Sequence, residues 1–124
     1  MDEINTLTGI VLKYAFKVHS SLGPGLLESS YKECLFYELK KNGIYTEKEK
    51  AMPLYYEDIK MDIGYRVDLI VENKVIVEIK CAECFSPVHV AQLLTYLKLS
   101  GCKIGFLLNF KTVSLKHGIK RLIA

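Results

Sequence analysis

The sequence lacks the features that would place it in a membrane or mark it for export. No apolar run approaches the roughly 20 residues that a membrane-spanning helix needs. Residues 1–20 contain Asp2 and Glu3, and they lack the apolar segment and cleavage site of a secretory signal peptide. No internal repeat, linker or low-complexity segment interrupts the 124 residues. We therefore expect a cytoplasmic protein with no membrane contact, folded as one domain over residues 1–124.

Cysteines are few, and their spacing does not complete a common metal site. The four are Cys34, Cys81, Cys84 and Cys102, which we expect to be reduced thiols in the cytoplasm. Cys81 and Cys84 have C-x-x-C spacing, but no second C-x-x-C supplies the other half of a zinc site, and only Cys102 or His89 could join them. A zinc or redox protein built on Cys81 and Cys84 is a third alternative.

A large excess of charge of one sign is also missing. Lys and Arg number 17 and Asp and Glu number 14, so the net charge at neutral pH is only +3. Hydrophobic residues make up 50% and charged residues 25% of the chain, which is typical of a globular domain. This balance permits a nucleic-acid partner without requiring one.

The strongest pattern in the chain lies between Tyr65 and Lys80. Two runs rich in Val and Ile flank a short polar turn near Asn73, which is typical of a β-hairpin. If the hairpin is symmetric about Asn73, Asp68 lies opposite Glu78. The same register pairs Ile70 with Ile76 and Leu69 with Val77.

Side chains alternate across a strand, so this hairpin is predicted to have one charged face and one apolar face. The charged face would carry Asp68, Ile70, Ile76, Glu78 and Lys80. The apolar face, which must be core, would carry Val67, Leu69, Val71, Val75, Val77 and Ile79.

The two opposed carboxylates need an explanation. At this register the Cβ atoms of Asp68 and Glu78 would be about 4.5–5.5 Å apart, and like charges so placed destabilise a sheet. Either the register differs, or a cation lies between the carboxylates. A hard ion such as Mg²⁺, which takes oxygen ligands and keeps several waters, fits the second alternative. Lys80, on the same face, would then point at whatever the ion holds.

Two helices are predicted before the hairpin. Apolar residues at helical spacing predict an amphipathic helix over residues 3–21, and a His near a helix end, such as His19, is more often a capping or packing residue than a ligand. The turn at 23–25 ends this helix, and a second helix is predicted over residues 26–42, closed by Gly43.

Glu28, at the start of the second helix, has two interpretations. Lys32 follows it at i+4, so the two could form a surface ion pair worth a few tenths of a kcal/mol. Alternatively, Glu28 is aimed into the site formed by the hairpin. The periodicity favours neither interpretation.

The rest of the chain is predicted to supply the other strands of the sheet and a helix that packs on it. Residues 44–56 have a β-like pattern broken by Pro53, and Ser86 before Pro87 is a strong helix start. The helix to Ser100 is expected to be largely buried through Val88, Val90, Ala91, Leu93, Leu94 and Leu97. Its polar stripe, which either bonds to nearby backbone or forms a wall of the site, is His89, Gln92 and Tyr96. A buried strand over 103–109 and a basic, solvated edge over 111–121 complete a mixed α/β sandwich.

The chain resembles a known family. Gly25, Glu28 and Tyr31 match the signature that names the GxxExxY proteins, which belong to the PD-(D/E)xK nuclease-like superfamily. Further similarity is found in Val18-His19, Leu22–Gly25, Asn109-Phe110, Ser114-Leu115 and Ile119–Arg121, so it covers residues from about 5 to 124. The resemblance implies an α/β, restriction-endonuclease-like αβββαβ core with the site on the central strands. Val67 stands where the superfamily name has proline, a position that varies widely.

The resemblance also implies roles for particular residues. Asp68, Glu78 and Lys80 correspond to the D…E-x-K constellation, and Glu28 is the added carboxylate. Gln92 and Tyr96 match the Q-x-x-x-Y element of the RecB-like branch. The implied ligands of Mg²⁺ or Mn²⁺ are Glu28, Asp68, Glu78 and the carbonyl of Ile79. The implied catalytic residues are Asp68, Glu78, Lys80 and Gln92, supported by Tyr31, Tyr96 and His19.

The leading hypothesis is therefore a divalent-metal-dependent phosphodiesterase, a nuclease that acts on nucleic acid. DNA is the expected substrate. The alternative is a catalytically silent module of the same fold that binds nucleic acid or a protein partner, because a fold does not fix a function. No DNA-reading module is evident in the sequence. Targeting would therefore need a homodimer, a protein partner or loose specificity.

Overall fold

The computed structural model describes residues 2–124; Met1, the first residue of the predicted domain, lies outside the described residues. The helices are α1 (Asp2–Leu22), α2 (Glu28–Lys41), α3 (Pro87–Ser100) and the short 3-10 helix η1 (Leu115–Gly118). The strands are β1 (Thr46–Met52), β2 (Tyr55–Tyr56), β3 (Ile59–Lys60), β4 (Tyr65–Val71), β5 (Val75–Lys80), β6 (Ile104–Asn109) and β7 (Ile119–Ile123). Within residues 2–124, no helix has both the length and the apolar character that crossing a bilayer requires.

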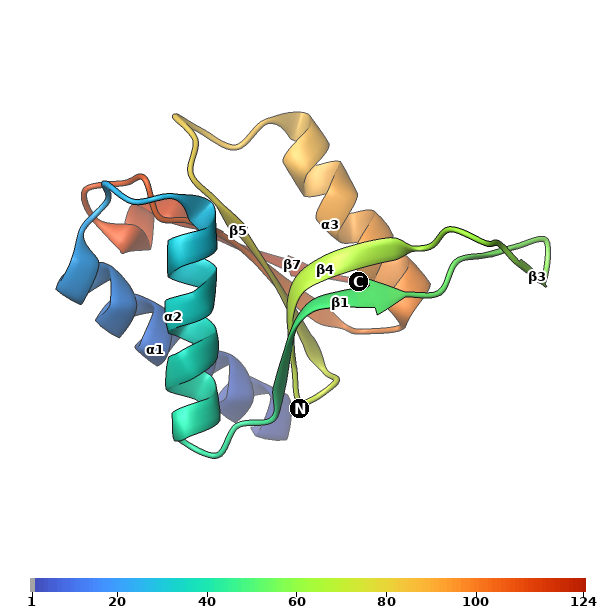
Figure 1. Cartoon of the computed structure of the whole chain (residues 1–124), viewed down its shortest axis with the longest axis horizontal. Helices are drawn as coiled ribbons and strands as arrows, with labels where there is room; N and C mark the ends of the chain where they lie inside the picture. The colour runs from blue at the N-terminus through green and yellow to red at the C-terminus, as the bar shows by residue number, and fades with distance from the viewer. Residues whose placement is uncertain (1) are drawn as a thin grey trace.

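Five strands form one mixed sheet in the order β1-β4-β5-β6-β7. Strands β5 and β6 are parallel and are connected through α3, whereas the other neighbouring pairs are antiparallel. Figure 1 shows α1 and α2 on one side of the sheet and α3 on the other. The elements α2, β1, β4, β5, α3 and β6 follow the predicted αβββαβ order. The predicted fold is thus confirmed: it is a mixed α/β domain consistent with a restriction-endonuclease-like fold.

A hydrophobic core lies on each face of the sheet. The larger core, under α1 and α2, contains Val11, Leu35, Leu69, Val71, Val77, Ile79, Phe106 and Phe110 among others. The smaller core, under α3, contains Val67, Ile70, Ile76, Leu93, Leu97, Cys102 and Leu107. Because both faces are covered, the central strands β5 and β6 are almost entirely buried, as the predicted buried strand over 103–109 required.

The predicted hairpin is formed by β4 and β5. Glu72 and Asn73 take left-handed φ values of 52° and 54°, as the two central residues of a type I′ hairpin turn do. The N–H of Lys74 donates to the carbonyl oxygen of Val71 at 2.9 Å, which closes the turn. The predicted register is confirmed by the pairs Leu69–Val77, Ile70–Ile76 and Val71–Val75.

The predicted division of the hairpin into two faces is wrong at Val67. Leu69 and Val71 pack under α1 and α2 as expected, but Val67 belongs to the core under α3. Regular alternation would put all three on one face. The alternation is interrupted between Val67 and Leu69, at Asp68, where the ladder on each side of β4 lacks a pair.

The predicted start of α3 is confirmed. The Ser86 Oγ accepts a hydrogen bond from the N–H of His89 at 3.3 Å, and the His89 Nδ1 accepts one from the N–H of Ser86 at 3.1 Å. These reciprocal bonds satisfy two backbone donors that a helix end otherwise leaves free. Of the two interpretations of the polar stripe, backbone bonding is the one that holds for His89.

The expectation that α3 is largely buried is wrong. The helix faces the sheet through Leu93 and Leu97, whereas Val88, Ala91 and Leu94 are exposed. Leu93 lies over Gly105. A Cβ atom added at Gly105 would be only 2.8 Å from the Cδ1 atom of Leu93. Packing against this glycine fixes the rotation of the helix and turns the other apolar side chains outward.

One edge of the sheet follows the predicted pattern and the other differs from it. Strand β1 ends at Met52, directly before Pro53, and the chain continues into a projecting arm that carries β2 and β3 (Figure 1). At the other edge, the segment predicted only as a basic, solvated edge contains β7, which pairs with β6. Lys120 and Arg121 on β7 are exposed, so the basic character of the edge was predicted and its strand was not.

Candidate active site

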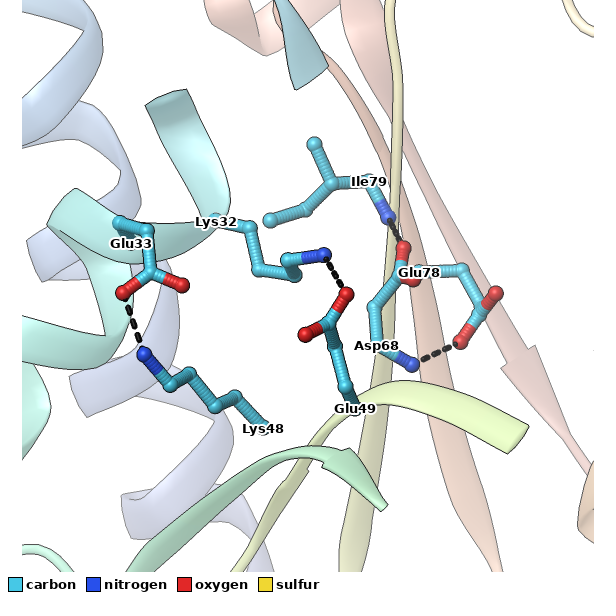
Figure 2. Close-up of polar contacts among 7 residues, drawn as sticks. All are labelled: Lys32, Glu33, Lys48, Glu49, Asp68, Glu78 and Ile79. Carbon is cyan, nitrogen blue, oxygen red and sulfur yellow. Dashed lines mark hydrogen bonds and ion pairs between the residues drawn. The ribbon is translucent and has the colours of Figure 1, made fainter. Parts of the chain in front are cut away.

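The site centres on the point where the hairpin ladder stops. Beyond the Leu69–Val77 pair, the N–H of Asp68 donates to the Oε2 atom of Glu78 at 2.8 Å. The N–H of Ile79 donates to the Oδ2 atom of Asp68, also at 2.8 Å (Figure 2). Side chains thus replace the next pair of backbone bonds between β4 and β5. The two carboxylates that the sequence places opposite each other are brought together in this way.

The ladder on the other side of β4 is interrupted at the same residue. Strand β1 pairs Lys48 with Leu69 and Lys50 with Val67, but Glu49 and Asp68 between them form no pair. Glu49 has a φ of 47°, a left-handed conformation that is uncommon for a residue other than glycine. Asp68 is therefore a residue of a central strand that lies outside both neighbouring ladders. Its carboxylate is free to accept a bond from β5 because the regular geometry is broken here.

Burial and mutual repulsion make this carboxylate pair costly to ionise. Glu78 is only 4% exposed, and burial, followed by the nearby charge of Asp68, raises its pKa from 4.5 to about 7. Burial also raises the pKa of Asp68, partly offset by the hydrogen bond from Ile79 and by the charges of Lys32 and Lys80. Like charges in a low-dielectric surrounding favour the neutral form of one partner, or a bound cation.

Two lysines flank the pair from different elements. The Nζ atom of Lys80 lies 3.4 Å from the Oε1 atom of Gln92 on α3, so these two predicted site residues are brought together. The Nζ atom of Lys32 on α2 lies 2.8 Å from the Oε1 atom of Glu49. Both lysines lower the pKa of Asp68, so both positive charges act on the same carboxylate.

Glu28 makes a contact that neither interpretation foresaw. Its Oε1 atom accepts a hydrogen bond at 3.1 Å from the N–H of Cys81, the residue directly after β5. Lys32 pairs with Glu49 in place of Glu28, so the suggested i+4 ion pair is wrong. Glu28 is exposed, and its charge still reaches Asp68, whose pKa it raises. The first turn of α2 is thereby attached to the end of the strand that carries Glu78.

Tyr31 and His19 hold the loop before α2. Tyr31 is fully buried and stacks on Phe110 at a ring-centroid distance of 4.5 Å. Its hydroxyl donates to the carbonyl of Gly23 and accepts from the N–H of Leu26 at 2.9 Å. The Nε2 atom of His19 lies 2.7 Å from the carbonyl oxygen of Thr112, so the packing interpretation of His19 holds.

Tyr96 closes the α3 side of the site. Its ring stacks on that of Tyr65, the first residue of β4, at a centroid distance of 5.0 Å. Burial raises the pKa of Tyr96, and the charges of Glu78 and Asp68 raise it further. The hydroxyl of Tyr96 is therefore neutral and lies within the electric field of the carboxylate pair.

A surface pocket of about 560 Å³ opens beside Glu28. It is lined by residues 24–29 together with Cys81 and Lys111. The Nζ atom of Lys111 lies 2.9 Å from Glu83, and Leu27 at the rim is 76% exposed. The pocket combines a cation, a carboxylate and apolar side chains next to the end of β5.

The donor atoms at the carboxylate pair suit a hard divalent cation. Glu78 is buried and Asp68 is half-buried, and a cation would relieve the repulsion between these oxygen donors. Within residues 2–124, no three His, Cys, Asp or Glu side chains are arranged to enclose an ion. Glu28, the implied third carboxylate, is engaged by Cys81. The residues therefore fit an ion held by two carboxylates that keeps several waters, as Mg²⁺ does.

Nothing in the described part of the chain favours zinc at the C-x-x-C pair. Cys81 is half-buried and its Sγ atom lies 3.7 Å from the carbonyl oxygen of Leu26, while Cys84 is exposed. Both are free thiols, and burial raises the pKa of Cys81. A raised pKa reduces the thiolate fraction that metal binding and redox chemistry use.

Sequence reasoning missed Lys32 and Glu49 as neighbours of the site. Charges of both signs alternate from Glu47 to Lys50, a pattern that is typical of a solvated face and does not mark Glu49 as a site residue. A pairing of this run with the central hairpin, which places Glu49 in register with Asp68, would have pointed to it. Pairing between these strands cannot be assigned from the pattern alone.

Comparisons with known proteins agree with this fold. A family model described as the PD-(D/E)XK nuclease superfamily matches residues 5–122, and nucleases of this superfamily generally use divalent metals. The crystal structure of SSO0001 is similar, with a TM-score of 0.51 and 22% sequence identity. The match covers 76% of this chain and 47% of the other, so this chain spans about half the length of that protein. At this identity the likeness shows the fold alone. No curated protein matches the chain.

Proposed function

The chain belongs to the PD-(D/E)XK nuclease superfamily, and from this premise we propose that it is a divalent-metal-dependent phosphodiesterase that cleaves nucleic acid, DNA in the first place. The observation that carries the proposal is the pair of buried Glu78 and half-buried Asp68, held where the ladder of the central hairpin stops, with Lys80 beside it. Like charges placed opposite each other destabilise a sheet. A bound cation would relieve this repulsion.

The proposal assigns the ligands from this chain's own donors. Asp68, Glu78 and the carbonyl oxygen of Ile79 would hold the ion, and Glu28 would join them if it released the N–H of Cys81. When bound, such an ion supplies the Lewis acidity that favours attack of water on phosphorus. Mg²⁺ and Mn²⁺ both suit oxygen donors of this kind.

The remaining residues act on the phosphate. The ammonium group of Lys80 would neutralise the charge that builds on the phosphoryl oxygens during attack. Gln92 accepts a hydrogen bond from Lys80 and so orients it toward the carboxylate pair. Tyr96 braces Tyr65 at the α3 side, and Tyr31 fixes the loop from which Glu28 begins α2. Lys111 in the adjacent pocket would contact a neighbouring phosphate.

The finer classification and the targeting are part of the proposal. The spacing of Gly25, Glu28 and Tyr31 supports membership of the GxxExxY family, and Gln92 with Tyr96 supports the RecB-like branch. The sequence offers no evident DNA-reading module, so substrate choice would come from a second copy of the chain, a protein partner or loose specificity.

The second candidate is a catalytically silent module that binds nucleic acid or a protein. The observation in its favour is that each carboxylate of the pair already accepts a backbone N–H bond, which gives both a structural role. In this case Asp68 and Glu78 hold β4 to β5 and no ion enters.

Cleavage assays separate the two candidates. The protein would be incubated with single-stranded and double-stranded DNA and RNA in Mn²⁺, Mg²⁺ or EDTA, beside Lys80→Ala, Asp68→Asn and the surface control Lys98→Ala. We expect metal-dependent cleavage that falls at least about 100-fold in the first two variants and is unchanged in the control. Full activity in Lys80→Ala would remove that residue from the mechanism. Binding without cleavage by the folded wild type would establish the silent module.

A further inference from the structure

Lys32 and Glu49 form an ion pair that joins α2 to β1 beside the carboxylate pair. The Nζ atom of Lys32 lies 2.8 Å from the Oε1 atom of Glu49. The side chain of Lys32 is only 13% exposed, whereas that of Glu49 is 50% exposed. A lysine is rarely covered to this extent, because its ammonium group is strongly hydrated. Figure 2 shows the pair next to Asp68.

A second ion pair links the same two elements and provides an internal comparison. Lys48 on β1 pairs with Glu33 on α2, with the charges reversed relative to the first pair (Figure 2). Both of its side chains are well exposed, at 38% and 51%. A solvated pair of this kind contributes little to stability. If the first pair only attached α2 to β1, it would resemble the second in burial.

The backbone of β1 is distorted at the residue that holds Lys32. Glu49 is the residue in register with Asp68 where the β1–β4 ladder lacks a pair, and its φ is 47°. A left-handed glutamate in a strand costs about 1 kcal/mol. The distortion places the Glu49 carboxylate where it meets Lys32, on the α2 side of Asp68.

Lys32 acts electrostatically on the carboxylate pair as well as on Glu49. Burial alone would lower the pKa of Lys32, but the hydrogen bond to Glu49 and the charge of Asp68 outweigh burial and raise it. In return, the charge of Lys32 lowers the pKa of Asp68 and of Glu78. No hydrogen bond joins Lys32 to Asp68 among the contacts of residues 2–124, so Glu49 holds the ammonium group close to Asp68 without contact.

We propose that Lys32 is a positioning residue of the metal site: it supplies a counter-charge to Asp68 when the site is empty, and Glu49 restrains it from occupying the place of the divalent ion. This inference rests on the proposed function, because it concerns the same carboxylates. A fixed positive charge near the site opposes cation binding, and a negative charge that restrains it favours binding. The ion pair therefore sets how tightly the carboxylates hold an ion.

The proposal predicts opposite effects for the two partners of one ion pair. Removing the charge of Lys32 in Lys32→Met removes repulsion, so Mn²⁺ should bind on the order of tenfold more tightly. Glu49→Gln releases Lys32 toward Asp68 and removes a negative charge, so Mn²⁺ should bind on the order of tenfold more weakly. An ion pair that only held α2 to β1 would shift both variants in the same direction, because either change breaks the same contact.

The test is a calorimetric titration of the full chain with Mn²⁺ alone, at one ionic strength, with the fold of each variant checked by circular dichroism. Lys48→Met and Glu33→Gln change the formal charge in the same way at the exposed pair, and their affinities should stay within about twofold of wild type. Lys32→Arg keeps the charge, so it should also stay within about twofold. This variant shows that charge, and not the loss of a buried side chain, causes the effect of Lys32→Met.

Parallel cleavage by the wild type separates this inference from the proposed function. Equal Mn²⁺ affinities in Lys32→Met and Glu49→Gln, or shifts of one sign, would overturn the role of Lys32 even if the wild type cleaves. Opposite shifts without any cleavage would support the role of Lys32 and overturn the phosphodiesterase. No Mn²⁺ binding by the folded wild type would overturn both.

Discussion

The two ends of the β4–β5 hairpin are built from the same two strands and differ in almost every other respect. At the turn end, Val71 pairs with Val75 and Ile70 with Ile76, and all four side chains are buried. At the open end, carboxylates take over the bonds that the backbone makes elsewhere in the ladder. One end follows the hydrophobic pattern of a covered sheet, and the other interrupts it.

The difference teaches where this fold is stabilised and where it is not. Apolar burial at the turn end contributes stability in proportion to the area removed from water. At the open end, the burial of Glu78 and its repulsion with the half-buried Asp68 raise the energy of the folded state, and the neighbouring strand β1 is distorted at Glu49. Strain of this kind persists where function requires it. The following changes should therefore affect the two ends in opposite ways.

The largest effect on stability is expected at the well-packed part of the hairpin. Ile76 is fully buried under α3, so Ile76→Ala should lower the free energy of unfolding by roughly 2–5 kcal/mol. Urea unfolding measured in EDTA checks this value. Ile63→Ala, at a side chain that is 81% exposed, should change it by less than about 0.5 kcal/mol. A cost below about 1 kcal/mol for Ile76→Ala would mean that this region is loosely packed.

The next effect is a pH dependence that comes from the open end. The pKa of Glu78 is raised in the folded state from 4.5 to about 7, so between these values the folded protein binds more protons than the unfolded chain. Without metal, stability should therefore be fully present below about pH 4.5 and fall as the pH rises to about 7. The loss should be on the order of 3 kcal/mol. Urea unfolding in EDTA across this range measures it.

The control for this pH dependence is Glu78→Gln, which keeps the size of the side chain and removes its charge. At pH 8 the variant should be more stable than the metal-free wild type, because the charge penalty is gone. Its stability should change little between pH 5 and pH 8. A wild type that gains stability over the same interval would show that the carboxylate pair is stabilising, contrary to the comparison of the two ends.

The smallest effect is expected at the turn itself. Asn73 has a φ of 54°, which glycine adopts at less cost, so Asn73→Gly should stabilise the protein by up to about 0.5 kcal/mol. The gain is small because glycine also adds freedom to the unfolded chain. Cleavage should not change, since the turn lies at the far end of the hairpin from Asp68. A loss of activity would show that a change at the turn alters the geometry of the carboxylates at the open end.

Much of the fold could be predicted because it follows from the spacing of hydrophobic residues and from the residues that form turns and helix caps. The hairpin register came from the symmetry of two Val- and Ile-rich runs about Asn73, and the structure has those pairs. The start of α3 came from Ser86 and Pro87, and the cap is present. Both signals are local, and local signals do not depend on how distant elements pack.

The parts that could not be predicted depend on long-range packing. Regular alternation predicts that Val67 and Leu69 lie on one face of the sheet, but the break at Asp68 puts Val67 on the opposite face. No property of the sequence marks that break. The rotation of α3 depends on Leu93 meeting Gly105. Within the site, the hairpin placed Asp68 near Glu78, whereas the contacts of Glu28 with Cys81 and of Lys32 with Glu49 join residues far apart in the chain.

The most direct test of this account compares one variant from each end of the hairpin. Cleavage with Mn²⁺ at pH 8 would be measured for the wild type, Ile76→Ala and Glu78→Gln, each corrected for its folded fraction. The account predicts that Ile76→Ala is less stable but cleaves within about threefold of the wild-type rate, and that Glu78→Gln is more stable without metal but loses at least about 100-fold in rate. Cleavage by Glu78→Gln at the wild-type rate would contradict the claim that the open end is the active site.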